Sequence, residues 1–118
     1  YDPVSVIATE EAMQRENLEP RIMIDCSHAN SGKKPYLQGH VLRDVVQQKI
    51  EGNASIIGFM LESNLREGNQ KLTSRPETLE YGLSITDPCI SWETTERLLR
   101  ETHAKLGACG DCTSRLRG

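Results

Sequence analysis

The sequence has no apolar run close to the roughly 20 residues that a membrane-spanning helix needs. It also has no excess of basic charge, because 14 Lys and Arg stand against 17 Asp and Glu and the net charge is -3 at pH 7. This composition indicates neither a nucleic-acid surface nor an acidic membrane as partner. No charged and then apolar leader opens the chain, so we expect a soluble, cytoplasmic protein.

Several signature motifs are also missing. There is no G-x-G-x-x-G, P-loop or G-x-S-x-G motif to indicate dinucleotide binding, nucleotide hydrolysis or serine-hydrolase chemistry. Cys109 and Cys112 form a lone C-x-x-C, and without a second ligand pair a structural zinc site is incomplete. We expect residues 107–118 to be a divergent, flexible tail. Cys26 and Cys89 lie in or beside apolar runs, where cysteine usually acts as a small hydrophobic residue.

What the sequence does contain is an alternation of two kinds of apolar pattern. Apolar positions at helical spacing predict helices, and short continuous apolar runs predict buried strands. We expect helices at residues 4–17, 40–51 and 92–105, and strands at residues 22–24, 55–61 and 82–86. The first helix should bury Val6 and Ile7, and the last should turn Trp92, Leu98 and Leu99 inward.

The order of these elements favours an α/β fold with a parallel sheet, either doubly wound or a barrel. With 118 residues the chain has the size of one small domain or of a piece of a larger one. Continuous apolar strands need cover on both faces and neighbours on both edges, which three strands cannot supply. The chain begins with Tyr1 rather than Met, and we expect it to be a slice of a larger α/β domain.

Each expected strand is followed by one residue that can bind a metal. His28 lies four positions after the first strand, Glu62 directly follows Leu61, and Asp87 directly follows Thr86. In parallel α/β sheets, functional groups gather at the carboxyl ends of the strands, and neighbouring strands are only about 4.8 Å apart. One imidazole and two carboxylates suit manganese, iron, cobalt or zinc. The pattern therefore predicts a shared site for a divalent metal ion.

Each of these residues also has an ordinary structural interpretation. A single histidine near a strand end often only forms hydrogen bonds or faces solvent, so His28 alone is weak support for a metal site. Glu62 can pair with Arg66, and Asp87 before Pro88 is a common turn former. The recurrence of such residues at three successive strand ends is what favours the shared site.

Three long blocks resemble one family. They are M-I-D-C-S-H-A-N-S at 23–31, I-I-G-F-M-L-E-S-N-L-R-E-G-N-Q at 56–70, and Y-G-L-S-I-T-D-P-C-I-S-W-E-T-T-E at 81–96. They look like the C-terminal third of the class I DAHP synthases (3-deoxy-D-arabino-heptulosonate 7-phosphate synthases). The resemblance covers residues 1–106 and implies that these residues are the C-terminal three β/α units of a TIM (β/α)8 barrel, with the helix that precedes them.

The resemblance also implies a reaction, the condensation of phosphoenolpyruvate with erythrose 4-phosphate in the first step of the shikimate pathway to aromatic amino acids. Members of this family need a divalent metal ion held by a cysteine, a histidine, a glutamate and an aspartate. The last three match His28, Glu62 and Asp87, the residues that the strand-end pattern indicates. The family further implies that the full-length protein is a homo-oligomer.

Parts of the family's site have no counterpart in this sequence. The cysteine ligand and the basic residues that hold the substrates' phosphates lie upstream in the family, and Lys33 and Lys34 do not match them. Departures from the family pattern stand at Asn64, Pro88 and Ser91. Pro88 can shift the carboxylate of Asp87. We expect residues 1–118 alone to be inactive; the alternative function is a non-catalytic metal-binding or barrel-associating module.

Overall fold

The computed structural model describes residues 1–109 and shows an α/β fold in this part of the chain. The helices are α1 (Pro3–Arg15), α2 (Pro35–Ile50) and α3 (Trp92–Ala108), with short 3-10 helices η1 (Ala29–Ser31) and η2 (Pro76–Thr78). The strands are β1 (Ile22–Asp25), β2 (Ile56–Met60), β3 (Ser63–Asn64) and β4 (Ile90–Ser91). The expected helices are present, with shifted ends.

Local sequence signals explain where the helices begin. The side chain of Asp2 accepts a hydrogen bond from the backbone amide of Ser5 at the start of α1. Ser91 caps α3 in the same way, accepting a hydrogen bond from the amide of Thr94 at 3.1 Å. Helix α2 begins five residues earlier than expected because Pro35, whose fixed φ suits a first helical position, opens it.

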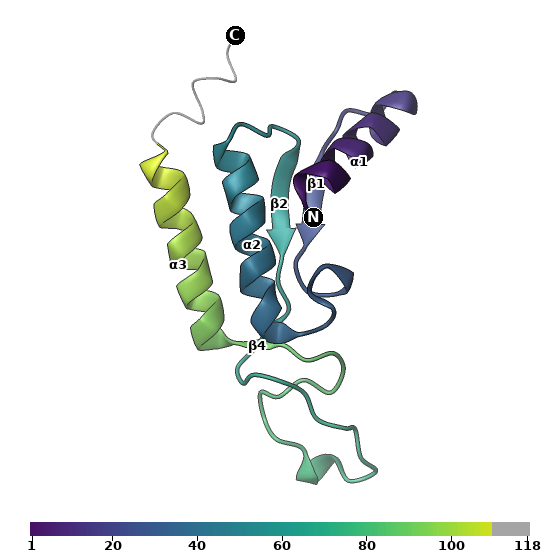
Figure 1. Ribbon diagram of the computed structural model, residues 1–118. Coiled ribbons are helices and arrows are strands. Elements are labelled where there is room, and N and C mark those ends of the chain that lie inside the picture. The colour runs from purple at the N-terminus through teal and green to yellow at the C-terminus, as the bar shows by residue number, and fades with distance from the viewer. Residues whose placement is uncertain (110–118) are drawn as a thin grey trace.

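Strands β1 and β2 pair in parallel, as predicted, and α2 is the crossover helix between them. Figure 1 shows α2 lying between β2 and α3. One face of the strand pair packs against α2 and contributes Ile24 and Ile56 to the core. Leu42 of α2 and Leu98 of α3 belong to the same buried cluster, which ties both helices to the sheet.

The second parallel pair, β3 and β4, brings a distant segment back to the end of β2. The amide of Ile90 in β4 donates to the carbonyl oxygen of Glu62 at 3.0 Å, just before β3 begins. Between β3 and β4 the chain makes a long excursion that extends away from the three helices (Figure 1). Residues near both ends of this excursion therefore lie at the carboxyl end of β2.

The expected strand at residues 82–86 is wrong. Gly82 has a φ of +79°, which is outside the extended region, and Ser84 makes only an isolated bridge to Asn69 among the described residues. The backbone oxygen of Ser84 instead accepts from the amide of Gln70 at 2.7 Å, so this segment is bonded to the outgoing arm of the excursion. The true strand is β4, which follows Asp87 rather than preceding it.

Some of the apolar helix residues that were expected to be buried are exposed instead. Trp92 and Leu99 of α3 are 55% and 43% exposed, and Ile7 of α1 is 52% exposed, while Leu98 and Val6 are buried as expected. On the strands, Met23 and Ile57 are 64% and 58% exposed. Met23 lies between Ile22 and Ile24, which both pack on the core, so by the alternation of side chains along a strand it faces away from α2. The pairing of β2 with β1 is irregular beside Ile57, so alternation does not assign that side chain to a face. One face of the β1–β2 pair is thus covered and the other is open in the described residues.

No helix in the described part of the chain has the length and apolarity needed to cross a membrane. Helix α3 runs to Ala108 and so includes the first two residues of the segment expected to be a tail. Cys112 lies outside the described residues. The prediction that the Cys109/Cys112 pair belongs to a flexible tail and is an incomplete zinc site therefore also lies outside them.

Candidate metal centre

His28, Glu62 and Asp87 lie together at the carboxyl ends of β1 and β2. His28 precedes η1 in the loop after β1, Glu62 lies between β2 and β3, and Asp87 comes three residues before β4. His28 Nε2 is 3.2 Å from Glu62 Oε1 and 3.7 Å from Asp87 Oδ2. One ligand atom from each residue lies within 4.8 Å of the other two, an arrangement that can surround a single ion. Pro88 has not turned the carboxylate of Asp87 away from the histidine.

The imidazole is oriented by a fourth residue, Asp25, the last residue of β1. Asp25 Oδ2 lies 2.6 Å from His28 Nδ1, and Asp25 Oδ1 accepts a hydrogen bond from the backbone amide of Ser27 at 2.8 Å. With Nδ1 donating its proton to Asp25, Nε2 keeps a lone pair directed at Glu62 and Asp87. Carboxylates in this position fix the ring and tautomer of metal-binding histidines.

The charges in this cluster shift two pKa values. The hydrogen bond that the His28 ring donates to Asp25 and the negative charge of Glu62 raise the pKa of His28, and partial burial opposes them only in part. For Asp25, burial acts to raise the pKa, but hydrogen bonds from the Ser27 amide and the His28 ring outweigh it and the pKa is lowered. The cluster therefore favours an ionised Asp25 and attracts positive charge to the position facing Nε2.

The backbone of Glu62 is held by a buried polar network. Its amide donates to Ser27 Oγ at 2.8 Å and to Gln38 Oε1 at 3.0 Å, and Gln38 Nε2 donates to its carbonyl oxygen at 3.2 Å. Ser27 Oγ in turn donates to Gln38 Oε1 at 3.1 Å. Gln38 is only 1% exposed and comes from α2. The same network thus joins the His28 loop, α2 and the residue that carries the Glu62 carboxylate.

We expect Gln38→Leu to lower the free energy of unfolding by about 1–3 kcal/mol, because buried hydrogen-bonding groups of Ser27 and Glu62 lose a partner. Chemical denaturation measures this loss. Gln47→Leu is the matched control, since Gln47 is an exposed glutamine of the same helix that bonds only Glu51 among the described residues. Equal stabilities of the two variants would contradict a structural role for the Gln38 network.

Two basic residues near the site form ion pairs. Arg66 pairs with Glu80 rather than with Glu62, so Glu62 remains directed at His28. Lys33 Nζ lies 3.1 Å from Asp87 Oδ2 and thus reaches the site from the first loop. Sequence reasoning singled out neither Asp25 nor Gln38; only the position of Asp25 three residues before the histidine was a usable signal.

Cys26 and Cys89 do not join the cluster. Cys26 is fully buried in the core, and burial together with the charge of Asp25 raises its pKa to about 11. Cys89 is 9% exposed, and burial is the main cause that raises its pKa. Both thiols are therefore held in the neutral form at pH 7, which is not the form that binds metals.

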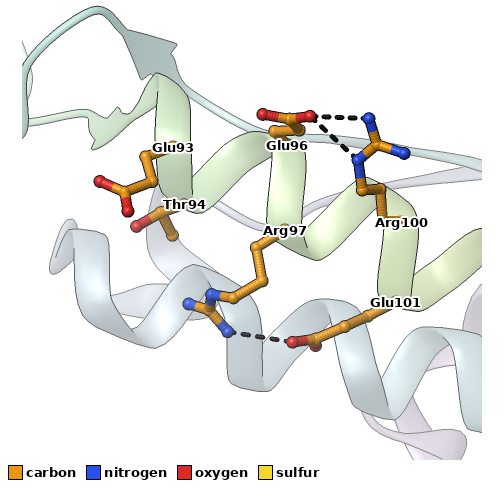
Figure 2. A pocket seen from close by; sticks show the side chains of 6 residues that line it. All are labelled: Glu93, Thr94, Glu96, Arg97, Arg100 and Glu101. Carbon is orange, nitrogen blue, oxygen red and sulfur yellow. Dashed lines mark hydrogen bonds and ion pairs between the residues drawn. The ribbon is translucent and has the colours of Figure 1, made fainter.

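A cavity on helix α3 has a different character. It is lined by Glu93, Thr94, Glu96, Arg97, Arg100 and Glu101 (Figure 2). Arg100 is bound to Glu96 at 2.8 Å, and Arg97 is bound to Glu101 at 3.1 Å. The hydrogen bond from Arg43 of α2 is the main cause that lowers the pKa of Glu101. Because these opposite charges already neutralise one another, we interpret the cavity as a solvated ion-pair surface.

Comparisons with known proteins match this chain to a single family of enzymes. The model of the DAHP synthetase I family matches residues 1–100. The chain is 47% identical over 116 residues to the Tyr-sensitive phospho-2-dehydro-3-deoxyheptonate aldolase of Escherichia coli, covering 98% of this chain and 32% of that protein. It is 46% identical over 102 residues to the tyrosine-inhibited phospho-2-dehydro-3-deoxyheptonate aldolase of Schizosaccharomyces pombe, covering 84% of this chain and 27% of that protein.

A solved structure agrees with these sequences. Phospho-2-dehydro-3-deoxyheptonate aldolase from Francisella tularensis superposes with a TM-score of 0.80 and 36% identity, over 88% of this chain and 30% of that one. The chain thus spans about a third of the length of the curated relatives it matches.

Proposed function

The chain belongs to the DAHP synthetase I family, and we propose that residues 1–106 form the C-terminal part of its (β/α)8 barrel. In that arrangement the last three β/α units would be supplied by this chain. The open face of the β1–β2 pair supports the proposal, because Met23 exposes a large apolar side chain there. In a barrel this face would be the packed interior.

The proposed activity of the full-length protein is that of 3-deoxy-7-phosphoheptulonate synthase, a transferase. Phosphoenolpyruvate would condense with erythrose 4-phosphate in the first step of aromatic amino acid biosynthesis. The observation that carries this proposal is the convergence of His28, Glu62 and Asp87 within 4.8 Å at the carboxyl ends of β1 and β2. Active sites of (β/α)8 barrels are built at that end.

The donor set fits a divalent metal ion. One imidazole nitrogen and two carboxylates suit manganese, iron, cobalt or zinc, and a carboxylate behind the imidazole is usual at such centres. We propose His28, Glu62 and Asp87 as the ligands from this chain. A bound ion would supply Lewis-acid polarisation of the aldehyde carbonyl of erythrose 4-phosphate.

The residues of this chain would act mainly by positioning. Asp25 holds the proton of Nδ1 and keeps Nε2 free to bind. The hydrogen bonds of Ser27 and Gln38 to the backbone of Glu62 fix the position from which its side chain extends to the site. Such fixed geometry matters because displacements near 1 Å can cost about 100-fold in rate. The fourth ligand and the groups that bind the substrates' phosphates would come from the rest of the full-length protein, which we propose to be a homo-oligomer.

The test is an assay of the condensation with the full-length protein, before and after chelation. We expect turnover with both substrates, loss of turnover after EDTA treatment, and recovery when a divalent metal ion is restored. Residues 1–118 alone should show no turnover with any metal. Turnover that chelation leaves unchanged would contradict the metal centre, and turnover by the isolated segment would contradict the need for the missing units.

A further inference from the structure

Among the described residues, Lys33 is the only lysine or arginine that forms an ion pair with the cluster of Asp25, His28, Glu62 and Asp87. Its ammonium nitrogen lies 3.1 Å from Asp87 Oδ2 and 3.3 Å from Asp87 Oδ1, so it engages both oxygens. Oδ2 is also the oxygen that lies 3.7 Å from His28 Nε2. The ammonium group therefore binds Asp87 through the same oxygen that faces the imidazole.

The loop that carries His28 also fixes the backbone position of Lys33. The backbone amide of Lys33 donates to the carbonyl oxygen of His28 at 2.9 Å, and that of Gly32 donates to Ala29 at 3.1 Å. Lys33 has a φ of +58°, an uncommon backbone conformation for a residue with a side chain. The turn thus directs the lysine stem across the site to a residue 54 positions later in the chain.

The charges around this contact set up a competition. Asp25, Glu62 and Asp87 contribute three carboxylates, and Lys33 is the ammonium group that offsets part of their charge. A divalent ion bound between Nε2 and the carboxylates would need an oxygen of Asp87 and would repel the ammonium group beside it.

We propose that Lys33 competes with the metal ion for the carboxylate of Asp87. Its ammonium group occupies the oxygens of the Asp87 carboxylate before an ion binds, and it is displaced from that carboxylate when the ion takes its place. This inference rests on the proposed metal centre, but it makes a separate prediction about the direction of a mutational effect. A lysine that merely stabilised the loop would strengthen metal binding, whereas a competing lysine weakens it.

The test is a calorimetric titration of the full-length protein with Mn²⁺ alone, after removal of bound metals. We expect Lys33→Met to bind Mn²⁺ about two- to fivefold more tightly than the wild type, the fold-change that corresponds to an exposed ion pair. Lys33→Arg, which keeps the charge, should stay close to the wild type. Lys34→Met is the matched control and should not change the affinity, because Lys34 forms no ion pair in the described residues.

Two further results separate the possible failures. If the wild type binds Mn²⁺ and His28→Ala abolishes binding, but Lys33→Met binds equally or more weakly, the competition is overturned and the metal centre stands. If neither the wild type nor Lys33→Met binds Mn²⁺, or if His28→Ala binds as the wild type does, both proposals are overturned. A circular dichroism melt of each variant establishes that it is folded; with Lys33 59% exposed, we expect unchanged melting.

Discussion

Each of the variants His28→Ala, Glu62→Ala and Asp87→Ala should bind a divalent metal ion at least about 100-fold more weakly than the full-length wild type. Loss of a residue that only hydrogen-bonds a metal ligand already costs up to about 100-fold. The reason is that each residue supplies one of a small number of ligand atoms that lie within 4.8 Å of one another. Losing any one leaves the ion with water in place of a fixed donor. Titration with Mn²⁺ after removal of bound metals measures the loss.

Suitable controls carry the same side chains away from the cluster. His40 and Glu93 are exposed on α2 and α3, and alanine at either should leave the affinity unchanged. Comparable losses at all three cluster positions would show that the side chains share one ion. A large loss at only one position would mean that the others merely lie close by.

The second large effect is expected at Asp25, which contacts the imidazole on its far side. Asp25→Asn should weaken metal binding by about 10- to 100-fold, as is typical when a carboxylate behind a metal-binding histidine is removed. The substituted amide keeps the size of the side chain but loses the charge that stabilises the ring 2.6 Å away. Asp44→Asn, on α2, is the matched control; an unchanged affinity for Asp25→Asn would contradict the orienting role.

The same substitution has a readout that needs no metal. The hydrogen bond that His28 donates to Asp25 is the largest cause that raises the pKa of His28, so Asp25→Asn should lower that pKa in an NMR titration. The sign for stability follows from linkage. A histidine with a raised folded-state pKa stabilises the fold fully below its unfolded pKa of about 6.5, and this contribution is lost as the pH rises through the folded-state value. In Asp25→Asn this contribution should be smaller.

The sequence indicated the cluster because of a general property of parallel sheets. Chemistry-bearing residues that follow successive strands share one edge of the sheet, so positions 28, 62 and 87 could be placed together without knowing any distance. That reasoning worked for Asp87 although its supporting strand was misplaced. The segment 82–86 has the apolar content of a strand, but its backbone groups bond to the outgoing arm of the excursion, and periodicity carries no information about such a partner.

The supporting residues were harder to predict for a related reason. Gln38 is a polar residue on the buried face of α2, where a helical pattern leads one to expect apolar side chains, and its partners are Ser27 and the backbone of Glu62. The contact between Lys33 and Asp87 joins residues 54 positions apart. Both depend on tertiary packing, which local patterns do not encode.

Exposed apolar side chains mark the limit of the helix and strand predictions. Trp92 and Leu99 fit a helical stripe, yet α3 packs on α2 through Leu98 and leaves them open to solvent. In the proposed barrel, further elements of the full-length protein would adjoin this part of the chain, and some of these side chains would become buried there.

The most direct test of the shared metal site is anomalous diffraction from crystals of the full-length protein grown with Mn²⁺. We predict one anomalous peak within about 2.0–2.3 Å of His28 Nε2 and of a carboxylate oxygen from both Glu62 and Asp87. A peak bound elsewhere, or a site where the ion contacts only one of these three side chains, would contradict it.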